Sequence, residues 1–562
     1  MSTFKLSSAS KIDVTRNTVN SYPSIWGDQF LTYDEKKDIV MGNQLVEDLK
    51  REVSEELLVI RATDESIQHM KLIELIDVVQ RLGIAYHFEN KIEEALQYIY
   101  VTYRDHGVGI NHLQSISLWF RILRQQGFNV SSEIFKSYLN EDGHSKESLC
   151  SDIQGMLALY EAAYMRVEGE VVLNSALEFT KIHLGIISND PHCDSSIRTQ
   201  IKQVLNQPLR KRLPRLEAVH FIPFYEQQAS HNEVLLTLAK LDFNMLQSMH
   251  RNELSKVCKW WKDLDFQKKL PYVRDRLIEG YFWILGIYFE PQYSSLRIFL
   301  IKSCMWLVVI DDTYDNYGTY EELEIFTQAV ERWSICYSDT LPDTLPEYMK
   351  IIFQELVNIY QEMDDRLAKE GKSYHIQHIK EMFKEYTRCL LVEAKWLKVG
   401  YTPSLKEYMT NSLVTVGYAI MIAKSYVGRD TMVTNDTFKW VASYPPLVKA
   451  TCLILRLMDD ISTHKEEQER PHIPSSIECY QKETGASEHE ACEYFLNQVE
   501  DAWKIINQES LRPTSIPFHL IMPAINLARV CDVLYKGNDG YKHAGEEVIS
   551  YIKTLLVHPL AL

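Results

Sequence analysis

The sequence has few helix-breaking residues and lacks the patterns of a disulfide or zinc framework. Glycine and proline are sparse, at 21 and 18 of 562 residues, which predicts long helices joined by short loops. The 10 cysteines include no Cys-x-x-Cys pair, so we expect reduced thiols rather than disulfides or zinc ligands. Strand-like alternation and hairpin dipeptides are nearly absent, which disfavours a fold built on β-sheet.

Positive charge and long apolar runs are also scarce. The formal net charge is -17 at pH 7, which argues against nucleic acid as a partner and gives no reason to expect an anionic membrane surface. Lys302 and Lys424 interrupt the two best apolar candidates, so no membrane span is expected. The first 16 residues have no apolar signal core and are short for a transit peptide. We therefore expect a cytoplasmic protein.

Hydrophobic residues recur with helical spacing along most of the chain, for example over residues 45–57 and 73–82. We predict an all-α fold. A chain of this length is too long for one hydrophobic core, so two helical domains are expected. A junction near residues 210–215, or shortly before a helix over 233–246, divides the chain into residues 1–235 and 236–562. The first part has no cluster of acids, histidines or cysteines with site-like spacing.

An apolar stretch over residues 298–310 ends abruptly in the acids of the sequence DDTYD. If this segment is helical, Asp311 and Asp315 share a face, while Asp312 points about 100° away. Like charges at this spacing repel each other. A hard cation such as Mg²⁺ would remove that repulsion, because it binds carboxylate oxygens and keeps other positions for water and phosphate. The alternative is an acidic helix end that is simply solvated.

A second apolar segment, residues 453–467, also delivers oxygen ligands at its end. Asp459, Thr463 and Glu467 recur every four residues and form one stripe along a helix. Arg456 lies one turn before Asp459 on the same side. Two such clusters on separate helices favour a metal site over two solvated helix ends.

Three other segments could complete a site. Residues 269–276 are predicted to open a helix that presents Arg274 and Arg276, and arginine forks bind phosphate oxygens in pairs; a surface arginine pair is the alternative. Gly417 permits a break in an apolar helix over residues 412–428, where free carbonyl groups would face a cavity; a glycine that serves close packing is the alternative. Residues 534–543 form a polar, glycine-containing loop, either a mobile lid or a plain connection.

Together these features predict the ionisation of an allylic diphosphate. The two acid clusters would hold Mg²⁺ ions that bridge the diphosphate, and the arginines would neutralise the charge that grows as it leaves. An apolar cavity would receive the carbocation. The π faces of Trp283, Tyr535 and Tyr541 could stabilise it.

The chain resembles a plant terpene synthase, most closely the cytosolic sesquiterpene type, essentially from end to end. The resemblance rests on residues 22–28 (YPSIWGD), on Arg274-Asp275-Arg276, on the DDTYD acids and on a second metal motif of the form (N/D)Dxx(S/T)xxxE. Asp459, Asp460, Thr463 and Glu467 satisfy this second motif.

The resemblance implies a C-terminal α-barrel that carries the site and an N-terminal helical barrel without catalysis. It implies three Mg²⁺ ions, with Mn²⁺ as a possible substitute, and a monomer that acts on a prenyl diphosphate. It also assigns individual roles. The expected metal ligands are Asp311, Asp315, Asp459, Thr463 and Glu467. The residues expected to bind the diphosphate are Arg274, Arg276, Arg456 and the ligands Asp311, Asp315 and Asp459, and Arg276 is also expected to support the lid. The expected catalytic residues are Trp283, Tyr535, Asp539 and Tyr541.

One departure from the family pattern affects the expected substrate. The tandem arginine that precedes the N-terminal tryptophan in the family is Arg16-Asn17 here. This change and the missing transit peptide favour farnesyl over geranyl diphosphate, with a monoterpene synthase or a chain-elongating prenyltransferase as alternatives. A phosphatase of the haloacid dehalogenase type, with residues 307–310 as a strand, and a non-enzymatic helical scaffold are further alternatives. The sequence does not specify the product.

Overall fold

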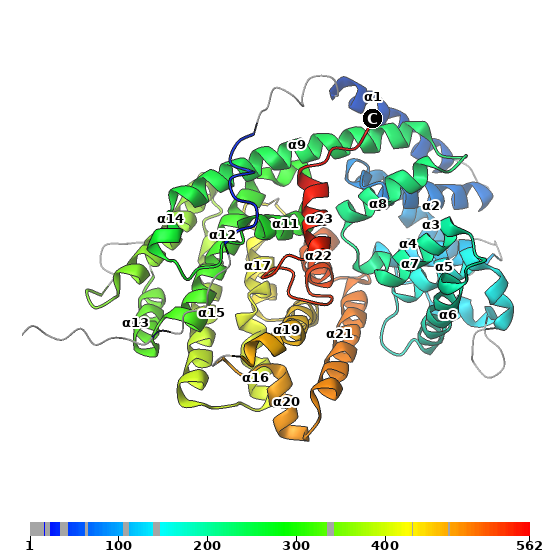
Figure 1. Ribbon diagram of the computed structural model, residues 1–562. Coiled ribbons are helices and arrows are strands. Elements are labelled where there is room, and N and C mark those ends of the chain that lie inside the picture. The colour runs from blue at the N-terminus through cyan, green and yellow to red at the C-terminus, as the bar shows by residue number, and fades with distance from the viewer. Residues whose placement is uncertain are drawn as a thin grey trace, which may run out of the picture.

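The computed structural model describes residues 16, 23–33, 43–61, 66–104, 112–138, 146–333, 342–429, 431–469 and 472–562. Every regular element among these residues is a helix, and none is a strand (Figure 1). This confirms the predicted all-α class. Residues 307–310, the possible phosphatase strand, lie inside a helix, so that alternative is wrong.

The N-terminal half is a bundle of short helices around its own hydrophobic core. The core draws on residues from Val46 to Ala239, and a smaller cluster fills the space between α5, α6 and α7. Its helices are α1 (Asn43–Arg61), α2 (Ser66–Arg81), α3 (Glu89–Tyr103), α4 (Leu113–Gln125), α5 (Ile153–Ala163), α6 (Val171–Asn189), α7 (Ser195–Asn206) and α8 (Pro214–Glu226), with short 3-10 turns η2 (Ala85–His87), η3 (Ser132–Tyr138), η4 (Glu147–Ser151) and η5 (Leu209–Lys211).

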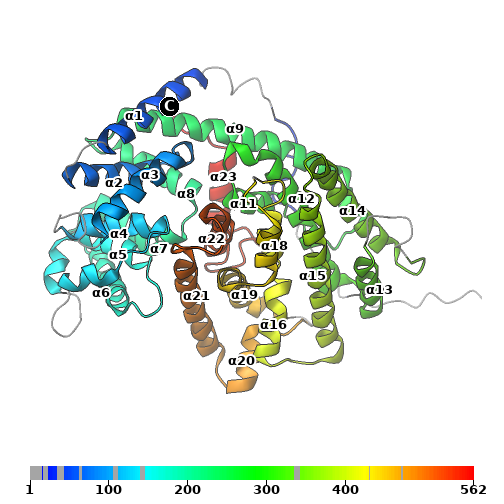
Figure 2. The same cartoon turned by 180° about the vertical axis from the view of Figure 1, so that it is seen from behind.

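One long helix, α9 (Glu233–Asp263), connects the two halves. It begins where the side chain of Asn232 accepts a hydrogen bond from the backbone N–H of Val234 at 2.9 Å, as a helix N-cap does. Figures 1 and 2 show α9 running along the top of the molecule over both halves. Its first turns pack in the N-terminal core, and residues from Phe243 onward pack in the C-terminal core. The predicted division after residue 235 falls at the start of this helix and stays a prediction.

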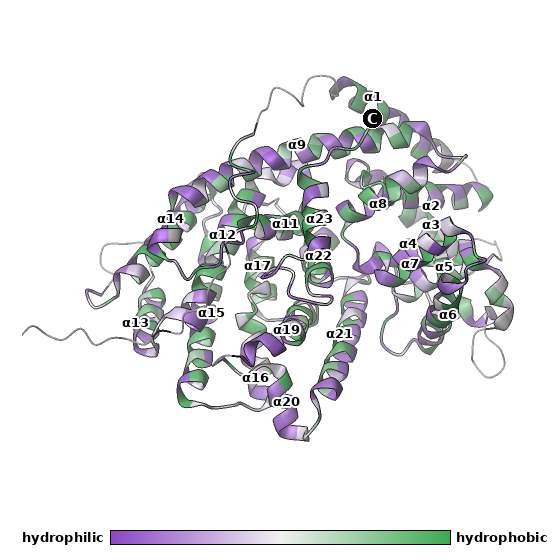
Figure 3. Cartoon of the chain, in the orientation of Figure 1, coloured by the Kyte–Doolittle hydropathy of each residue, from purple (hydrophilic) through white to green (hydrophobic). Residues whose placement is uncertain are grey.

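The larger C-terminal half surrounds the second core. Figure 3 shows hydrophilic and hydrophobic positions on nearly every helix, the pattern of amphipathic helices packed around a core. Its further helices are α10 (Phe266–Lys269), α11 (Leu277–Ile287), α12 (Ser294–Asp312), α13 (Tyr320–Glu331), α14 (Glu347–Ala368), α15 (Tyr374–Val399), α16 (Leu405–Thr415), α17 (Tyr418–Lys424), α18 (Asn435–Ala442), α19 (Pro446–Glu467), α20 (Ser476–Thr484), α21 (Glu488–Ser510), α22 (Phe518–Leu534) and α23 (Glu546–Leu556), with the 3-10 turn η6 (Pro291–Tyr293) and the π-helical turn η7 (Thr313–Tyr317).

The N-terminal segment packs on the C-terminal half. Trp26 and Phe30 belong to the C-terminal core, and the indole N–H of Trp26 donates to Glu279 Oε1 at 2.9 Å. Arg16 forms a two-pronged ion pair with Glu322, both contacts at 2.9 Å. The arginine of the Arg16-Asn17 departure therefore contacts the C-terminal half, while Asn17 lies outside the described residues.

The apolar helix over residues 412–428 is broken, as its glycine predicted. α16 ends at Thr415, and α17 begins at Tyr418. Gly417 between them has a φ of 76°, a backbone conformation that residues other than glycine rarely adopt.

One helical stretch, Pro291–Tyr317, is long and apolar enough to cross a membrane by composition alone, and the bent pair α18 and α19 passes the same test. In the first stretch, 61% of the apolar window is buried inside the protein. That degree of burial is typical of a core helix. The absence of a membrane span stays a prediction.

Candidate active site

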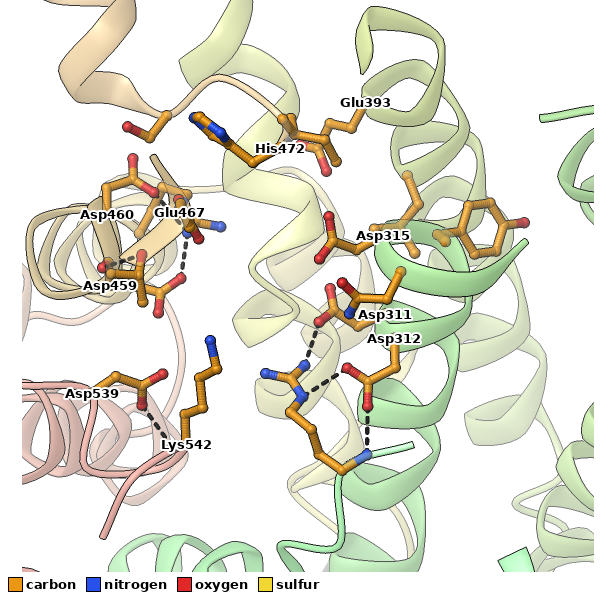
Figure 4. Close-up of a pocket in the computed structure, with 18 of the residues that line it drawn as sticks. Asp311, Asp312, Asp315, Glu393, Asp459, Asp460, Glu467, His472, Asp539 and Lys542 are labelled. Atoms are coloured by element: carbon orange, nitrogen blue, oxygen red, sulfur yellow. Dashed lines mark hydrogen bonds and ion pairs between the residues drawn. The ribbon is translucent and has the colours of Figure 1, made fainter. Parts of the chain in front are cut away.

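A polar pocket and an aromatic pocket adjoin in the C-terminal half. They share Arg274, Asp311, Arg456, Asp459 and Asp539 in their linings, so one opens into the other. Figure 4 shows the acids of α12 and η7 facing those of α19 across a gap. The charged side chains that line the polar pocket are Asp311, Asp312, Asp315, Glu393, Asp459, Asp460, Glu467, Asp539, Arg274, Arg276, Arg456 and Lys542, together with His472.

The side of the gap formed by α12 and η7 is the α12 wall, and the side formed by α19 is the α19 wall. Neighbouring acids of the α12 wall have different surroundings. Asp311 and Asp315 both line the polar pocket. The side chain of Asp312 is fully buried and accepts a hydrogen bond from the backbone N–H of Arg274 at 2.8 Å. The offset between Asp312 and its neighbours is therefore the one that helical geometry predicts.

The α19 wall repeats this plan. Asp459, Thr463 and Glu467 line the polar pocket as one stripe. Asp460 is buried and accepts hydrogen bonds from the Tyr408 hydroxyl and from the backbone N–H of Ser476, both at 2.9 Å. In each wall the first acid of the pair faces the gap, and the second fastens a neighbouring segment.

Each wall carries its own arginine. Arg274 pairs with Asp311 and Asp312, both at 2.7 Å. Arg456 pairs with Asp459 and, at 2.7 Å, with Asp460. The arginines thus hold the acids of each wall together and leave positive charge beside the gap.

The prediction that residues 269–276 open a helix is wrong. The helix begins only at Leu277, and Arg274 and Arg276 lie in the turn before it. Neither is a surface arginine: Arg276 is buried, and Arg274 lines both pockets. The Nε of Arg276 donates to the backbone carbonyl of Lys542 in the loop over 535–545 at 2.9 Å; its role in supporting a lid stays a prediction.

The aromatic pocket is built around Trp283. Its ring centroid lies 5.9 Å from that of Tyr418, 6.1 Å from Tyr535 and 5.3 Å from Tyr541, all edge to face. The remaining lining residues are Cys304, Leu307, Val308, Tyr386, Thr415, Val416, Gly417, Met421 and Leu455. The helix break at Gly417 therefore contributes directly to the cavity wall.

Asp539 shapes the loop that covers this cavity. Its carboxylate accepts hydrogen bonds from the backbone N–H groups of Tyr541 at 3.0 Å and Lys542 at 2.8 Å. These bonds place Tyr541 against Trp283. The structure thus brings together all the residues predicted for the site, while their individual roles stay predictions.

Burial raises the pKa of Asp459, Glu467 and Asp312. The pKa of Asp459 rises to about 8 and that of Glu467 to about 7, because desolvation and neighbouring carboxylates outweigh the attraction of Arg456. Burial likewise raises the pKa of Asp312 to about 6. Carboxylates outnumber the cations here, so a bound cation would favour their ionised form.

Sequence reasoning missed Glu393. This residue of α15 lines the polar pocket and accepts hydrogen bonds from Thr415 Oγ1 at 2.7 Å and Asn411 Nδ2 at 3.0 Å. Burial raises its pKa to about 7. It is one of three acids in α15, with Glu381 and Glu385, and no spacing pattern distinguishes it from them.

The donor set fits a hard divalent cation. Within the described parts of the chain, no group of three or more histidine, cysteine, aspartate or glutamate side chains stands ready to hold a metal alone. The predicted ligands are instead divided between the two walls, and all of them offer oxygen. Mg²⁺ typically takes one or two carboxylates and fills its other positions with water and phosphate oxygens, so a divided site is suited to a metal that arrives with a diphosphate.

Comparisons with known proteins agree with this geometry. A model described as "Terpene synthase, N-terminal domain" matches residues 25–205, and one described as "Terpene synthase family, metal binding domain" matches residues 262–505. The chain belongs to the terpene synthase family. This confirms the resemblance. Membership of the family also indicates that the C-terminal half binds a divalent metal and acts on a prenyl diphosphate.

The sequences of related proteins align with this terpene synthase over almost its whole length. It is 64% identical to an (E)-beta-farnesene synthase of Artemisia annua over 99% of this chain and 96% of the relative. It is 51% identical to a sesquiterpene synthase of Xanthium strumarium over 98% of this chain and 100% of the relative. Among solved structures, isoprene synthase from grey poplar (Populus x canescens), in complex with three Mg²⁺ ions and dimethylallyl-S-thiolodiphosphate, has a TM-score of 0.83, with 33% identity over 92% of this chain and 97% of that chain.

Proposed function

We propose that this terpene synthase is a sesquiterpene synthase that ionises farnesyl diphosphate. One observation carries the proposal: the oxygen ligands of the two walls face each other across a polar pocket, and this pocket opens into an aromatic pocket. The names of the Artemisia and Xanthium relatives support a fifteen-carbon substrate.

The reaction is a heterolytic cleavage. The bond between C1 of the prenyl chain and the diphosphate oxygen breaks, and both electrons leave with the diphosphate. The resulting allylic carbocation rearranges or cyclises, then loses a proton or takes up water. Mg²⁺, when bound to the oxygens of the two walls, supplies Lewis-acid stabilisation of the leaving group; Mn²⁺ is proposed as a substitute.

Side chains of the two pockets stabilise the diphosphate and the carbocation, and the loop after α22 excludes water. Arg274 and Arg456 lie where the two pockets meet, and their charge stabilises the departing diphosphate there. The rings of Trp283, Tyr418 and Tyr535 present electron-rich surface to a carbocation. The loop held by Asp539 keeps water from the cation, which would otherwise be captured as an alcohol.

Two alternatives to this proposal remain: one has a different substrate, and the other a different reaction. Geranyl diphosphate would make the protein a monoterpene synthase, and chain elongation would make it a prenyltransferase. Elongating enzymes normally carry two DDxxD motifs, whereas the second wall here has Thr463 and Glu467. A cytoplasmic, monomeric protein stays part of the proposal.

Product analysis tests the proposal. The purified protein is incubated with geranyl, farnesyl or geranylgeranyl diphosphate, with Mg²⁺, Mn²⁺ or EDTA, and the extracted volatiles are analysed. We expect a fifteen-carbon hydrocarbon or alcohol from farnesyl diphosphate that requires the metal. Longer prenyl diphosphates would show elongation, a ten-carbon volatile as the main product would show a monoterpene synthase, and no turnover of any substrate would refute the proposal.

A further inference from the structure

Lys542 is a cation of the polar pocket that no metal or diphosphate motif contains. It lies in the loop between α22 and α23 and is the one lysine among the described residues that line this pocket. Figure 4 shows its side chain in the gap between Asp459 on one side and Asp311 on the other. Its side chain is only 13% exposed.

Two hydrogen bonds anchor the backbone of Lys542, while its side chain extends into the pocket. The backbone N–H donates to Asp539 Oδ1 at 2.8 Å, and the carbonyl accepts from Arg276 Nε at 2.9 Å. The ammonium group pairs with Glu466 Oε1 at 2.6 Å. Four rotatable bonds separate this charge from its anchored backbone, which allows it to change partners without moving the loop.

The partner of Lys542 differs from the partners of the arginines. Arg274 and Arg456 hold the buried acids Asp312 and Asp460, so removing either arginine from its wall would leave a buried charge unpaired. Glu466 does not line the pocket, and its side chain is 43% exposed. Water can solvate that half-exposed carboxylate when the ammonium departs, so breaking this pair leaves no buried carboxylate unpaired.

His543 makes this exchange easier still. Its Nε2 lies 3.5 Å from the second carboxylate oxygen of Glu466, so the glutamate keeps a neighbour after Lys542 leaves. The lysine is thus the pocket cation that can be transferred to an incoming anion at the lowest cost.

We propose that Lys542 is a further diphosphate-binding residue, whose ammonium group moves from Glu466 to the substrate's diphosphate and retains it after the C1–O bond breaks. The proposal rests on the proposed function, since it takes the polar pocket as the diphosphate site. It adds a contact from the C-terminal loop, so that binding the anion also fastens the loop over the aromatic pocket.

Binding of inorganic diphosphate tests this without requiring turnover. Titration calorimetry in saturating Mg²⁺ would compare the wild type with Lys542→Met, which keeps most of the side-chain length but removes the charge, and with Lys542→Arg. The matched control is Glu466→Gln, which breaks the same ion pair from the other side. Steady-state kinetics with farnesyl diphosphate accompany the titrations, and the Tm of each variant confirms folding.

We expect Lys542→Met to weaken diphosphate binding about tenfold, the size of one lost charge-assisted contact, and to raise KM more than it lowers kcat. Lys542→Arg should bind like the wild type, and Glu466→Gln as tightly or tighter. Wild-type affinity in Lys542→Met, or equal losses in Lys542→Met and Glu466→Gln, would overturn the proposal, because the ion pair would then only hold the loop. A wild type that binds Mg²⁺-diphosphate but forms no volatile product would instead refute the proposed function alone.

Discussion

The two walls of the site share a design but differ in what holds them in place. In each, two adjacent acids follow the apolar part of a helix, the first facing the gap and the second buried against a neighbour. The α19 wall is nearly self-contained, because Arg456, Asp459, Thr463 and Glu467 all belong to one helix. The α12 wall instead takes its arginine from the turn before α11.

The α12 wall also ends in a π-helical turn that distant residues support. Tyr272 contacts Thr313 Oγ1 through its hydroxyl at 3.0 Å and stacks on Tyr317 at 3.9 Å between ring centroids. Arg16 covers the other side, 4.3 Å from the Tyr317 ring, and donates to the Tyr317 carbonyl at 2.9 Å. One ligand stripe is therefore set by local helix geometry, while the other needs tertiary support.

Removing a ligand from either wall should have the largest effect. Asp311→Ala or Glu467→Ala is expected to lower kcat/KM for farnesyl diphosphate by about 1,000-fold, since each removes transition-state charge stabilisation worth about 4 kcal/mol. Product analysis and initial rates in saturating Mg²⁺ measure this. The exposed Asp365→Ala serves as control, and wild-type rates in both ligand variants would contradict the metal assignment.

The second acid of a pair should behave differently from the first. Asp460→Asn is expected to lower stability by about 2 kcal/mol, because it weakens the contacts to Tyr408, Ser476 and Arg456 in a buried setting. Activity should fall about 10- to 100-fold as the wall loosens. Asp459→Asn should lose activity but not stability. Thermal unfolding and rates together separate the two outcomes, and equal Tm values for both variants would remove the distinction.

The sequence predicted the ligand stripes because their spacing is local. Asp459 and Glu467 are placed by helical periodicity. The same spacing predicted a shared face for Asp311 and Asp315, although Asp315 lies in the π-helical turn that tertiary contacts support. The break at Gly417 was likewise visible, since it depends on one residue's backbone freedom. The turn that carries Arg274 was predicted as helix, and the buried role of Asp460 was not foreseen. Both depend on packing between elements.

Glu393 and the N-terminal contacts show the same limit of local reasoning. Glu393 reaches the pocket only because α15 packs beside α16, which brings its carboxylate to Thr415. Trp26 lies 253 residues from Glu279 in sequence, yet donates a hydrogen bond to it. Pattern analysis of one sequence carries no information about such pairs.

Stability without metal should depend on pH through the α19 wall. The raised pKa values of Asp459, about 8, and Glu467, about 7, mean that the folded protein holds more protons than the unfolded chain between about pH 4 and pH 8. Its stability should therefore fall as pH rises through this window. Asp459→Asn should reduce that loss by about 1 kcal/mol or more.

Thermal unfolding in EDTA at pH 5.5 and pH 8 measures this effect. The gain in Tm of Asp459→Asn over the wild type should be larger at pH 8, and Mg²⁺ with inorganic diphosphate should shrink it by stabilising the ionised carboxylates of the wild type. Asp365→Asn again provides the control. A gain that is the same at both pH values would show that Asp459 titrates as an ordinary exposed acid.

The smallest expected effect tests the distant support of the α12 wall. Arg16→Ala removes the ion pair with Glu322 and the cover over Tyr317, contacts that are partly exposed and worth about 1 kcal/mol together. We expect a loss in kcat/KM of about 2- to 5-fold, with apparent Mg²⁺ affinity falling by a similar factor because the turn bearing Asp315 loosens. Arg16→Lys keeps the charge but not the two-pronged contact, so it should recover only part of the loss. Among the described residues, the hydrogen bonds, ion pair and ring contacts given for Arg16 go to Tyr317, Glu322 and Tyr348. The effect of Arg16→Ala should therefore add to that of Asp460→Asn in the double variant; a strongly non-additive result would show that the two walls are coupled rather than separately supported.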